Sequence, residues 1–174
     1  MSENKDPLAN VKVSDDVAKK IPNYKEIETA YELMLRGASV GDLLGITPEN
    51  LETLYALGYS LYNSGKYEDS LKVFRALCLY ESTDVRFWLG LGGCQDNLKR
   101  YQEAAQAYAM GAVMSGLTDP EPMYYAALCF LKDNKKPEAI EAFEYIEMMG
   151  RDGNAHDLDF KDRAKALLNT LKNS

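Results

Sequence analysis

The sequence predicts an all-α protein built from repeated helix pairs, and two observations lead to this prediction. Residues 51–84 and 85–118 align with each other without a gap, at an offset of 34 residues. Within both stretches, apolar residues recur at the three- and four-residue spacing of amphipathic helices. The chain has 174 residues, which is enough for one domain with a hydrophobic core.

The residues that recur identify the type of repeat. Small residues return where helices must approach each other closely, and aromatic residues return where each helix pair turns. A third copy begins near Pro120, now at an offset of 35 residues. A period of 34 residues with this pattern is typical of tetratricopeptide repeats (TPRs). The matching positions are Leu54, Leu57, Gly58, Tyr67, Ser70 and Phe74; Trp88, Leu91, Gly92, Tyr101, Ala104 and Tyr108; and Met123, Ala126, Ala127, Ala139 and Phe143.

We therefore predict three TPRs in a right-handed α-solenoid, with an N-terminal helix and a C-terminal capping helix. Thr47 and Pro48 are typical of a helix start, and Gly65 of a helix end. Outside the repeats, apolar periodicity predicts helices over 24–36 and 158–171 and a short helical turn over 40–44. The expected organisation is a flexible tail at 1–22, an N-terminal helical region at 23–46 that can dimerise, repeats within 47–155 (about 51–84, 85–119 and 120–153), and the capping helix at 156–174.

Composition and charge exclude several classes of function. Acidic residues outnumber basic ones by 27 to 20, which argues against a nucleic-acid surface. No apolar run approaches the ~18 residues of a membrane span, so we expect no stable membrane insertion. The first twenty residues lack the apolar core of a secretory signal, so we expect a cytoplasmic protein.

Catalytic and metal-binding patterns are also missing from the sequence. Cys78, Cys94 and Cys129 form no CxxC motif, and the single histidine, His156, has no readable partner. The helical spacing suggests that the cysteines are small buried hydrophobic residues. We expect no enzyme activity, no cofactor and no metal.

A second apolar stripe runs along the first helix of the first and third repeats, where packing does not require one. In the first repeat, Tyr55, Tyr59 and Tyr62 follow i, i+4, i+7 spacing. Tyrosine suits a binding face, because its ring buries well while its hydroxyl stays hydrated. The alternative is that helix 24–36 folds back and covers these rings. The predicted groove face comprises Tyr55, Tyr59, Tyr62, Asn63, Arg86, Leu89, Gly93, Asn97, Tyr124, Leu128 and Leu131.

These residues lie in segments that resemble a known family. GKYEDSLKVFRALC, RFWLGLGGC and the D-P-x-P opening of the third repeat are similar to the class II chaperones of bacterial type III secretion, over about 25–171. The resemblance implies a cytoplasmic homodimer that keeps two hydrophobic translocator proteins soluble and apart before export. It implies that an extended N-terminal segment of a translocator lies in the groove, and that Tyr55, Tyr59 and Tyr62 match the family's groove aromatics. In some members it implies a transcriptional regulator as a further partner.

Several alternatives stay open at this point. The resemblance places dimerisation on the N-terminal helix, whose apolar face consists of Ile27, Ala30, Tyr31, Met34 and Leu35. This face could instead pack on the first repeat of a monomer. The chain could be a TPR adaptor or regulatory protein that bridges soluble secretion or transcription partners. Binding of a partner's C-terminal carboxylate would need a cluster of Lys, Arg and Asn in the groove, for which only Asn63, Arg86, Asn97 and Lys132 are available.

Overall fold

The computed structural model describes residues 24–173, and the chain divides into two units, residues 1–38 and 39–174. The expected tail at 1–22 lies outside the described residues. In the first unit, the described helix is α2 (Tyr24–Leu35). Gly37 follows it with φ of 96°, a conformation that glycine adopts without steric cost. Its N–H donates to the carbonyl of Met34 (2.9 Å), which closes the helix.

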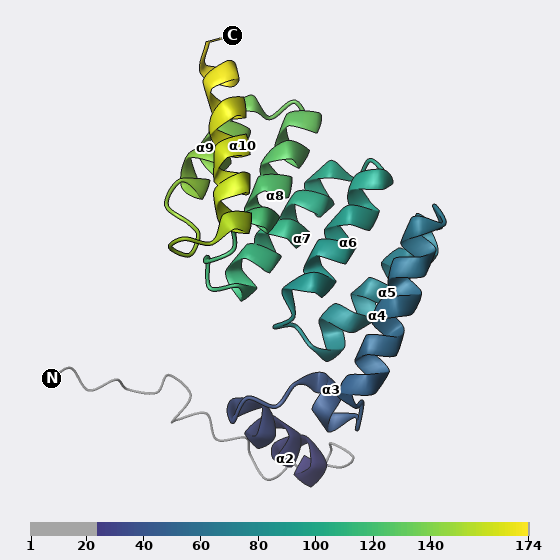
Figure 1. Cartoon of the computed structure of the whole chain (residues 1–174). Helices are drawn as coiled ribbons and strands as arrows, with labels where there is room; N and C mark the ends of the chain where they lie inside the picture. Colours follow the sequence, from purple (N-terminus) through teal and green to yellow (C-terminus); the bar gives the residue numbers. More distant parts are fainter. Residues whose placement is uncertain (1–23, 174) are drawn as a thin grey trace, which may run out of the picture. The chain divides into compact units, whose positions relative to one another are not determined.

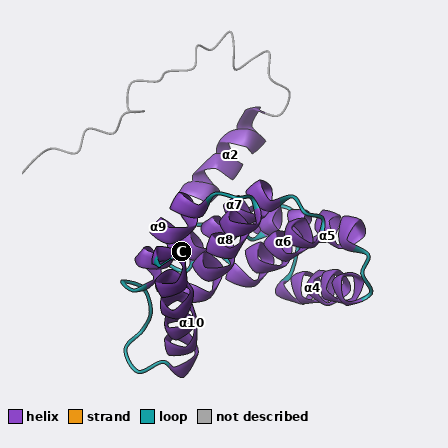
Figure 2. Ribbon diagram, turned by 90° about the horizontal axis from the view of Figure 1, so that it is seen from above, coloured by secondary structure: helices purple, strands orange, loops and turns teal. Residues whose placement is uncertain are grey.

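The second unit is a stack of three helix pairs followed by a single helix (Figure 1). Each helix of the three pairs contacts the next along the chain, and the short helix that precedes them contacts the second helix of the first pair. The last helix packs against both helices of the third pair. Figure 2 shows α4 (Pro48–Asn63) and α10 (Ala155–Lys172) at opposite ends of the stack, with α6 (Val85–Asn97) and α8 (Pro120–Lys132) between them. No strand occurs in residues 24–173, and the all-α TPR prediction is confirmed. The helices of this unit are α3 (Val40–Leu43), α4 (Pro48–Asn63), α5 (Tyr67–Tyr80), α6 (Val85–Asn97), α7 (Tyr101–Met114), α8 (Pro120–Lys132), α9 (Lys136–Ile146) and α10 (Ala155–Lys172).

Side-chain caps begin the first helix of each pair. At α4, the Thr47 hydroxyl accepts from the Asn50 N–H (3.2 Å), and the Asn50 side chain accepts from the Thr47 N–H (3.1 Å). This reciprocal cap satisfies two amides that the helix leaves free, and Pro48 occupies the first turn. Asp84 and Asp119 cap α6 and α8 through one side-chain oxygen each. The helix starts are thus encoded locally.

The turn inside each pair has the same backbone geometry in all three repeats. Gly65, Lys99 and Asn134 adopt φ of 72°, 60° and 59°, and they stand 34 and 35 residues apart. This left-handed position ends a helix by satisfying its last carbonyls, and it favours glycine or asparagine. The equivalence of the third repeat therefore extends to its backbone.

The recurring small residues lie where the paired helices touch. A Cβ on Gly58 of α4 would lie 3.2 Å from the ring of Phe74 on α5. The Ser70 hydroxyl donates to the Gly58 carbonyl (2.8 Å), and the Cys94 thiol lies 3.1 Å from the Ser70 oxygen. The cysteines are all free and buried. The small residues thus bring α4, α5 and α6 into direct contact.

The capping helix begins earlier than the periodicity predicted. We expected a helix from residue 158, but α10 starts at Ala155, because the Asn154 side chain accepts from the Asp157 N–H (3.1 Å). Asp157 is 1% exposed and accepts from Arg151 at its N–H (2.8 Å), Nε (2.9 Å) and Nη2 (2.7 Å). This cluster orders the loop between α9 and α10.

Candidate peptide-binding groove

Two stacked tyrosines on α4 form the open part of the candidate groove. The rings of Tyr55 and Tyr59 lie 6.3 Å apart between centroids, at an interplanar angle of 20°. Tyr59 is 55% exposed, whereas Tyr55 is half-buried against Phe74 and Phe87. Tyr55 therefore supports Tyr59 from below, and Tyr59 offers a large ring to a partner.

Arg86 fixes the edge of this aromatic pair. Its guanidinium carbon lies 5.0 Å from the Tyr55 ring centroid, within the range of cation–π attraction. The same guanidinium donates to Asp84 and Glu52, each at 2.6 Å. These carboxylates raise the pKa of Arg86 above its already high value, while burial raises the pKa of Tyr55. The charge of Arg86 is thus already paired within the chain.

Tyr62 belongs to a contact between α4 and α6 that the sequence did not reveal. The Asn97 amide donates to the Tyr62 hydroxyl (2.9 Å) and to the Gly93 carbonyl (2.9 Å). A Cβ on Gly93 would lie 3.3 Å from a Tyr62 ring carbon. Burial raises the pKa of Tyr62, and the hydrogen bond from Asn97 opposes that shift. Tyr62 and Asn97 therefore join two repeats on the groove face.

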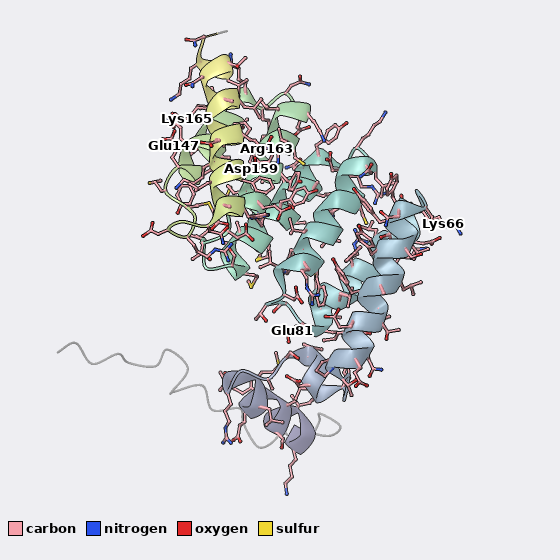
Figure 3. All side chains as sticks on the ribbon, viewed as in Figure 1. Lys66, Glu81, Glu147, Asp159, Arg163 and Lys165 are labelled. Atoms are coloured by element: carbon pink, nitrogen blue, oxygen red, sulfur yellow. The ribbon has the colours of Figure 1, made fainter. Side chains whose placement is uncertain are left out.

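The third repeat presents less surface than the first. Tyr124 is 5% exposed, and its ring lies 5.3 Å from Phe160 of α10 and 6.0 Å from Phe143. Figure 3 shows Arg163 on α10, and its guanidinium carbon lies 4.6 Å from the Tyr124 ring centroid. The structure thus places Tyr124 in the core, where Phe160 of the capping helix covers it.

The other predicted groove residues lie on the same three helices. Leu89, Leu128 and Leu131 are half-buried, while Asn63 is exposed at the end of α4. Lys132 pairs with Asp96 at 2.6 Å and so links α8 to α6. Because Arg86 and Lys132 already have acidic partners, a clamp for a C-terminal carboxylate would first have to break these ion pairs.

The predicted dimerisation face on α2 is apolar and open. The exposed fractions are 53% for Ile27, 50% for Tyr31, 48% for Met34 and 71% for Leu35. Ala30 is half-buried. An apolar stripe of this kind typically packs against another surface.

The structure brings together one polar cluster that the sequence did not predict. Asp119, Glu121 and His156 place their ligand-type atoms within 4.8 Å of one another, and His156 Nε2 lies 3.2 Å from Glu121. Burial raises the pKa of Glu121, and the His156 charge opposes the shift. His156 follows Glu121 by 35 positions and Asp119 by 37, so sequence spacing did not indicate the cluster. They join the start of α10 to the start of α8, and each has a polar partner within the chain.

Among the helices of residues 24–173, none is both long and apolar enough to cross a membrane. The apolar surfaces described above belong to amphipathic helices.

Comparisons with known proteins identify the family. The tetratricopeptide repeat family matches residues 55–115. The chain is 34% identical over 152 residues to the low calcium response locus protein H of Yersinia pestis, which covers 85% of this chain and 88% of that protein.

Solved structures agree with this match. A type III secretion complex from Aeromonas hydrophila has a TM-score of 0.74 and 30% identity, covering 83% of this chain and 96% of that one. The Yersinia enterocolitica type III secretion chaperone SycD, in complex with a peptide of the translocator YopD, has a TM-score of 0.66 and 35% identity, covering 73% and 95%. Proteins of this kind are secretion chaperones and not enzymes. The chain therefore belongs to the TPR-containing class II chaperones of type III secretion translocators.

Proposed function

We propose that this chain is a cytoplasmic chaperone of a bacterial type III secretion system. In this proposal, its groove face binds extended N-terminal segments of two hydrophobic translocator proteins and keeps them soluble and apart before export. The observation that carries the proposal is the open Tyr59 ring, stacked on Tyr55 at 6.3 Å. It occurs in a chain 35% identical to a chaperone whose structure contains a translocator peptide.

The mechanism is the masking of apolar client surface. An apolar client side chain placed against Tyr59 would leave water, as would one placed against Leu89 or Leu128. Each fully buried anchor contributes about 1.5–3 kcal/mol, part of which the ordering of the peptide offsets. Three or four anchors leave an affinity of roughly micromolar Kd. Such an affinity retains a client in the cell and still permits its release for export.

The identity of the retained proteins tests this proposal. The tagged chain would be purified from its own cells, and the retained proteins identified by mass spectrometry. We expect one or two proteins with long apolar segments. Tyr59→Ala should reduce their recovery at least about tenfold, because loss of one anchor of ~1.5–3 kcal/mol changes Kd by that order.

A matched control distinguishes an effect specific to the groove from the effect of removing any exposed tyrosine. Tyr145 on α9 is 41% exposed and lies away from the groove face, so Tyr145→Ala should retain the clients in full. Retention of both clients by folded Tyr59→Ala would refute the groove assignment. Recovery of only soluble apparatus or regulatory proteins would favour the adaptor function instead.

We also propose that the apolar face of α2 forms a homodimer. Burial of Leu35 and Ile27 against a second copy would remove their exposed area from water. Light scattering at micromolar concentration should give twice the 19.5 kDa mass of one chain. Leu35→Asp should shift the mass towards 19.5 kDa. A monomeric mass for the unmodified chain would exclude the dimer.

A further inference from the structure

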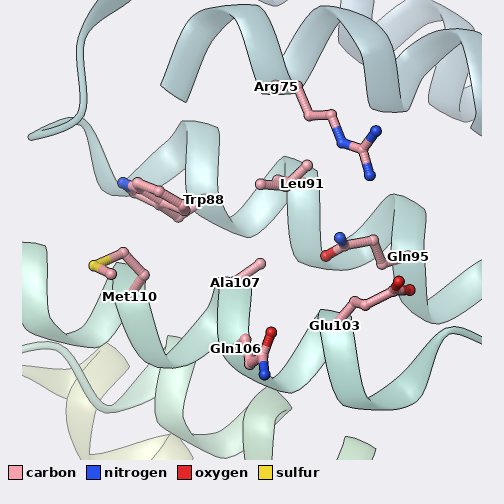
Figure 4. A pocket seen from close by; sticks show the side chains of 8 residues that line it. All are labelled: Arg75, Trp88, Leu91, Gln95, Glu103, Gln106, Ala107 and Met110. Carbon is pink, nitrogen blue, oxygen red and sulfur yellow. The ribbon is translucent and has the colours of Figure 1, made fainter. Parts of the chain in front are cut away.

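A cleft on the side of α6 opposite the groove face (Figure 4) contains a buried polar atom that has no hydrogen-bond partner in the described part of the chain. The cleft has a volume of about 280 Å³, with α6 as its floor and α5 and α7 as its walls. Its floor residues are Trp88, Leu91 and Gln95. At about 100° per residue, these side chains project within roughly 60° of one another and about half a turn from Gly93. The cleft and the groove are therefore separate surfaces.

Gln95 is the unusual residue of this cleft. Its side chain is 6% exposed, and its Oε1 has no hydrogen-bond partner among residues 24–173. Burying an amide oxygen without a donor is costly. The repeat does not require glutamine here, because the equivalent positions of the other repeats hold Leu61 and Phe130. Packing alone thus does not explain the residue.

The cleft has a polar end and an apolar end. Figure 4 shows Arg75 and Glu103 at the end where Gln95 lies, and Trp88 and Met110 at the other. Trp88 is held in place by its indole N–H, which donates to the Ser82 carbonyl (2.7 Å). Arg75 is exposed and makes no hydrogen bond or ion pair with the described part of the chain. The polar end thus offers one free acceptor, on Gln95, and free donors on Arg75.

One acceptor on Gln95 and the donors on Arg75 together match the hydrogen-bonding groups of a peptide bond. A backbone amide has one N–H, which Gln95 Oε1 can accept, and one carbonyl, to which Arg75 can donate. Trp88 and Gln95 are seven residues apart on α6, or about 10 Å along the helix. An extended chain covers that length in about three residues. If a bulky apolar side chain of the docked peptide packs on Trp88, the peptide's backbone amide three residues further along therefore lies beside Gln95.

We propose that this cleft docks an extended segment of a second polypeptide while a client occupies the groove face. The segment places an apolar side chain between Trp88 and Met110, and a backbone amide between Gln95 and Arg75. Since the two surfaces lie on opposite sides of α6, the two ligands do not compete. The chaperone thereby gains a docking site for a partner other than its client.

Trp88 provides a direct test, because it is the only tryptophan in the chain. The full ¹⁵N-labelled chain would be titrated with a capped pentapeptide that carries one leucine among serines. We expect the Trp88 indole and Gln95 side-chain amide signals to shift saturably, with a Kd of roughly millimolar for so short a peptide. The same peptide with serine in place of leucine should produce no saturable shift.

Two variants test whether the peptide binds in the cleft or on the groove face. Gln95→Leu should weaken binding at least about fivefold, and it should fold because Leu61 and Phe130 already hold this position elsewhere. Tyr59→Ala, on the groove face, should bind the peptide as the unmodified chain does. The proposal is overturned if no saturable shift appears up to about 10 mM peptide. It is overturned equally if Gln95→Leu binds unchanged, or if Tyr59→Ala abolishes the shift.

Discussion

Replacing Gly90 with alanine should destabilise the chain, although alanine is the better helix former. A Cβ on Gly90 would lie 2.2, 2.4 and 2.5 Å from three carbons of the Phe74 ring. Phe74 is 2% exposed, and the Tyr55 ring meets it edge-on at 6.0 Å. The ring therefore cannot move aside without displacing other core residues.

The structure sets the expected magnitude. Carbon atoms in ordinary contact are about 3.5–4.0 Å apart, so the ring and helix must separate by roughly 1 Å or more. Overpacking of this kind typically costs about 1–3 kcal/mol, and alanine recovers about 1 kcal/mol of helix propensity. Because the clash is with three ring atoms, we take the upper end and expect a net loss of about 2 kcal/mol. For a chain of this size, that loss lowers Tm by about 4–8 °C.

Gly93→Ala is the matched control in the same helix. Its Cβ would lie 3.3 Å from the nearest Tyr62 carbon, which requires only a small adjustment. We expect unchanged or slightly higher stability, by up to about 1 kcal/mol. Circular dichroism during heating and urea unfolding of both variants measures the difference. A Tm for Gly90→Ala equal to or above that of the unmodified chain would refute the packing argument. A stable Gly93→Ala that binds its client weakly would indicate that a client backbone passes close to Gly93.

The remaining predictions concern buried ionisable groups. Asp157→Asn should lower the free energy of unfolding by about 2–4 kcal/mol, because Arg151 loses a charged acceptor. Arg151 holds the pKa of Asp157 well below its usual range, so the unmodified chain should lose this stability as the pH falls below about 4. The variant should lack that step, and parallel urea-unfolding curves between pH 3 and 7 would contradict the assignment. Burial raises the pKa of Cys78 and Cys129 to about 12, so a disulfide reagent at pH 8 should label them at least about 10³-fold more slowly in the folded than in the urea-unfolded chain. Rapid labelling of the folded chain would contradict their burial.

Local signals predicted the helix pairs well. Thr47 caps the start of α4 as its neighbour Pro48 suggested, and Gly65 ends α4 in the left-handed conformation. The helix cap and the helix end both depend on contacts within four residues, so the two contacting residues are close together in the sequence and can be recognised there. The extent of α10 was harder to predict, because its start depends on Asn154 and on the buried Asp157 within a segment that does not repeat.

On the groove face, too, local spacing predicted some features correctly and missed others. Helical spacing placed Tyr55 and Tyr59 side by side on α4, where the structure stacks them. The same reasoning treated Tyr124 as their equivalent, yet Phe160 covers it. Phe160 is 36 residues further along the chain, and no periodicity links the two positions. Whether a ring on a helix is open or covered depends on what packs against it.

By itself, the sequence determined the repeat, the start and end of the first helix of the first repeat, and the side of that helix that carries the tyrosines. The 34-residue period and the helical spacing could be recognised because both are regular patterns along the linear sequence. The tertiary structure alone decided which polar groups find partners. It joined Asn97 to Tyr62, paired Arg86 with Glu52 and, among residues 24–173, left the Gln95 oxygen without a donor. The physical reason is that a hydrogen bond depends on atoms within about 3 Å in space, and residues of different repeats reach that distance only after the helices have stacked.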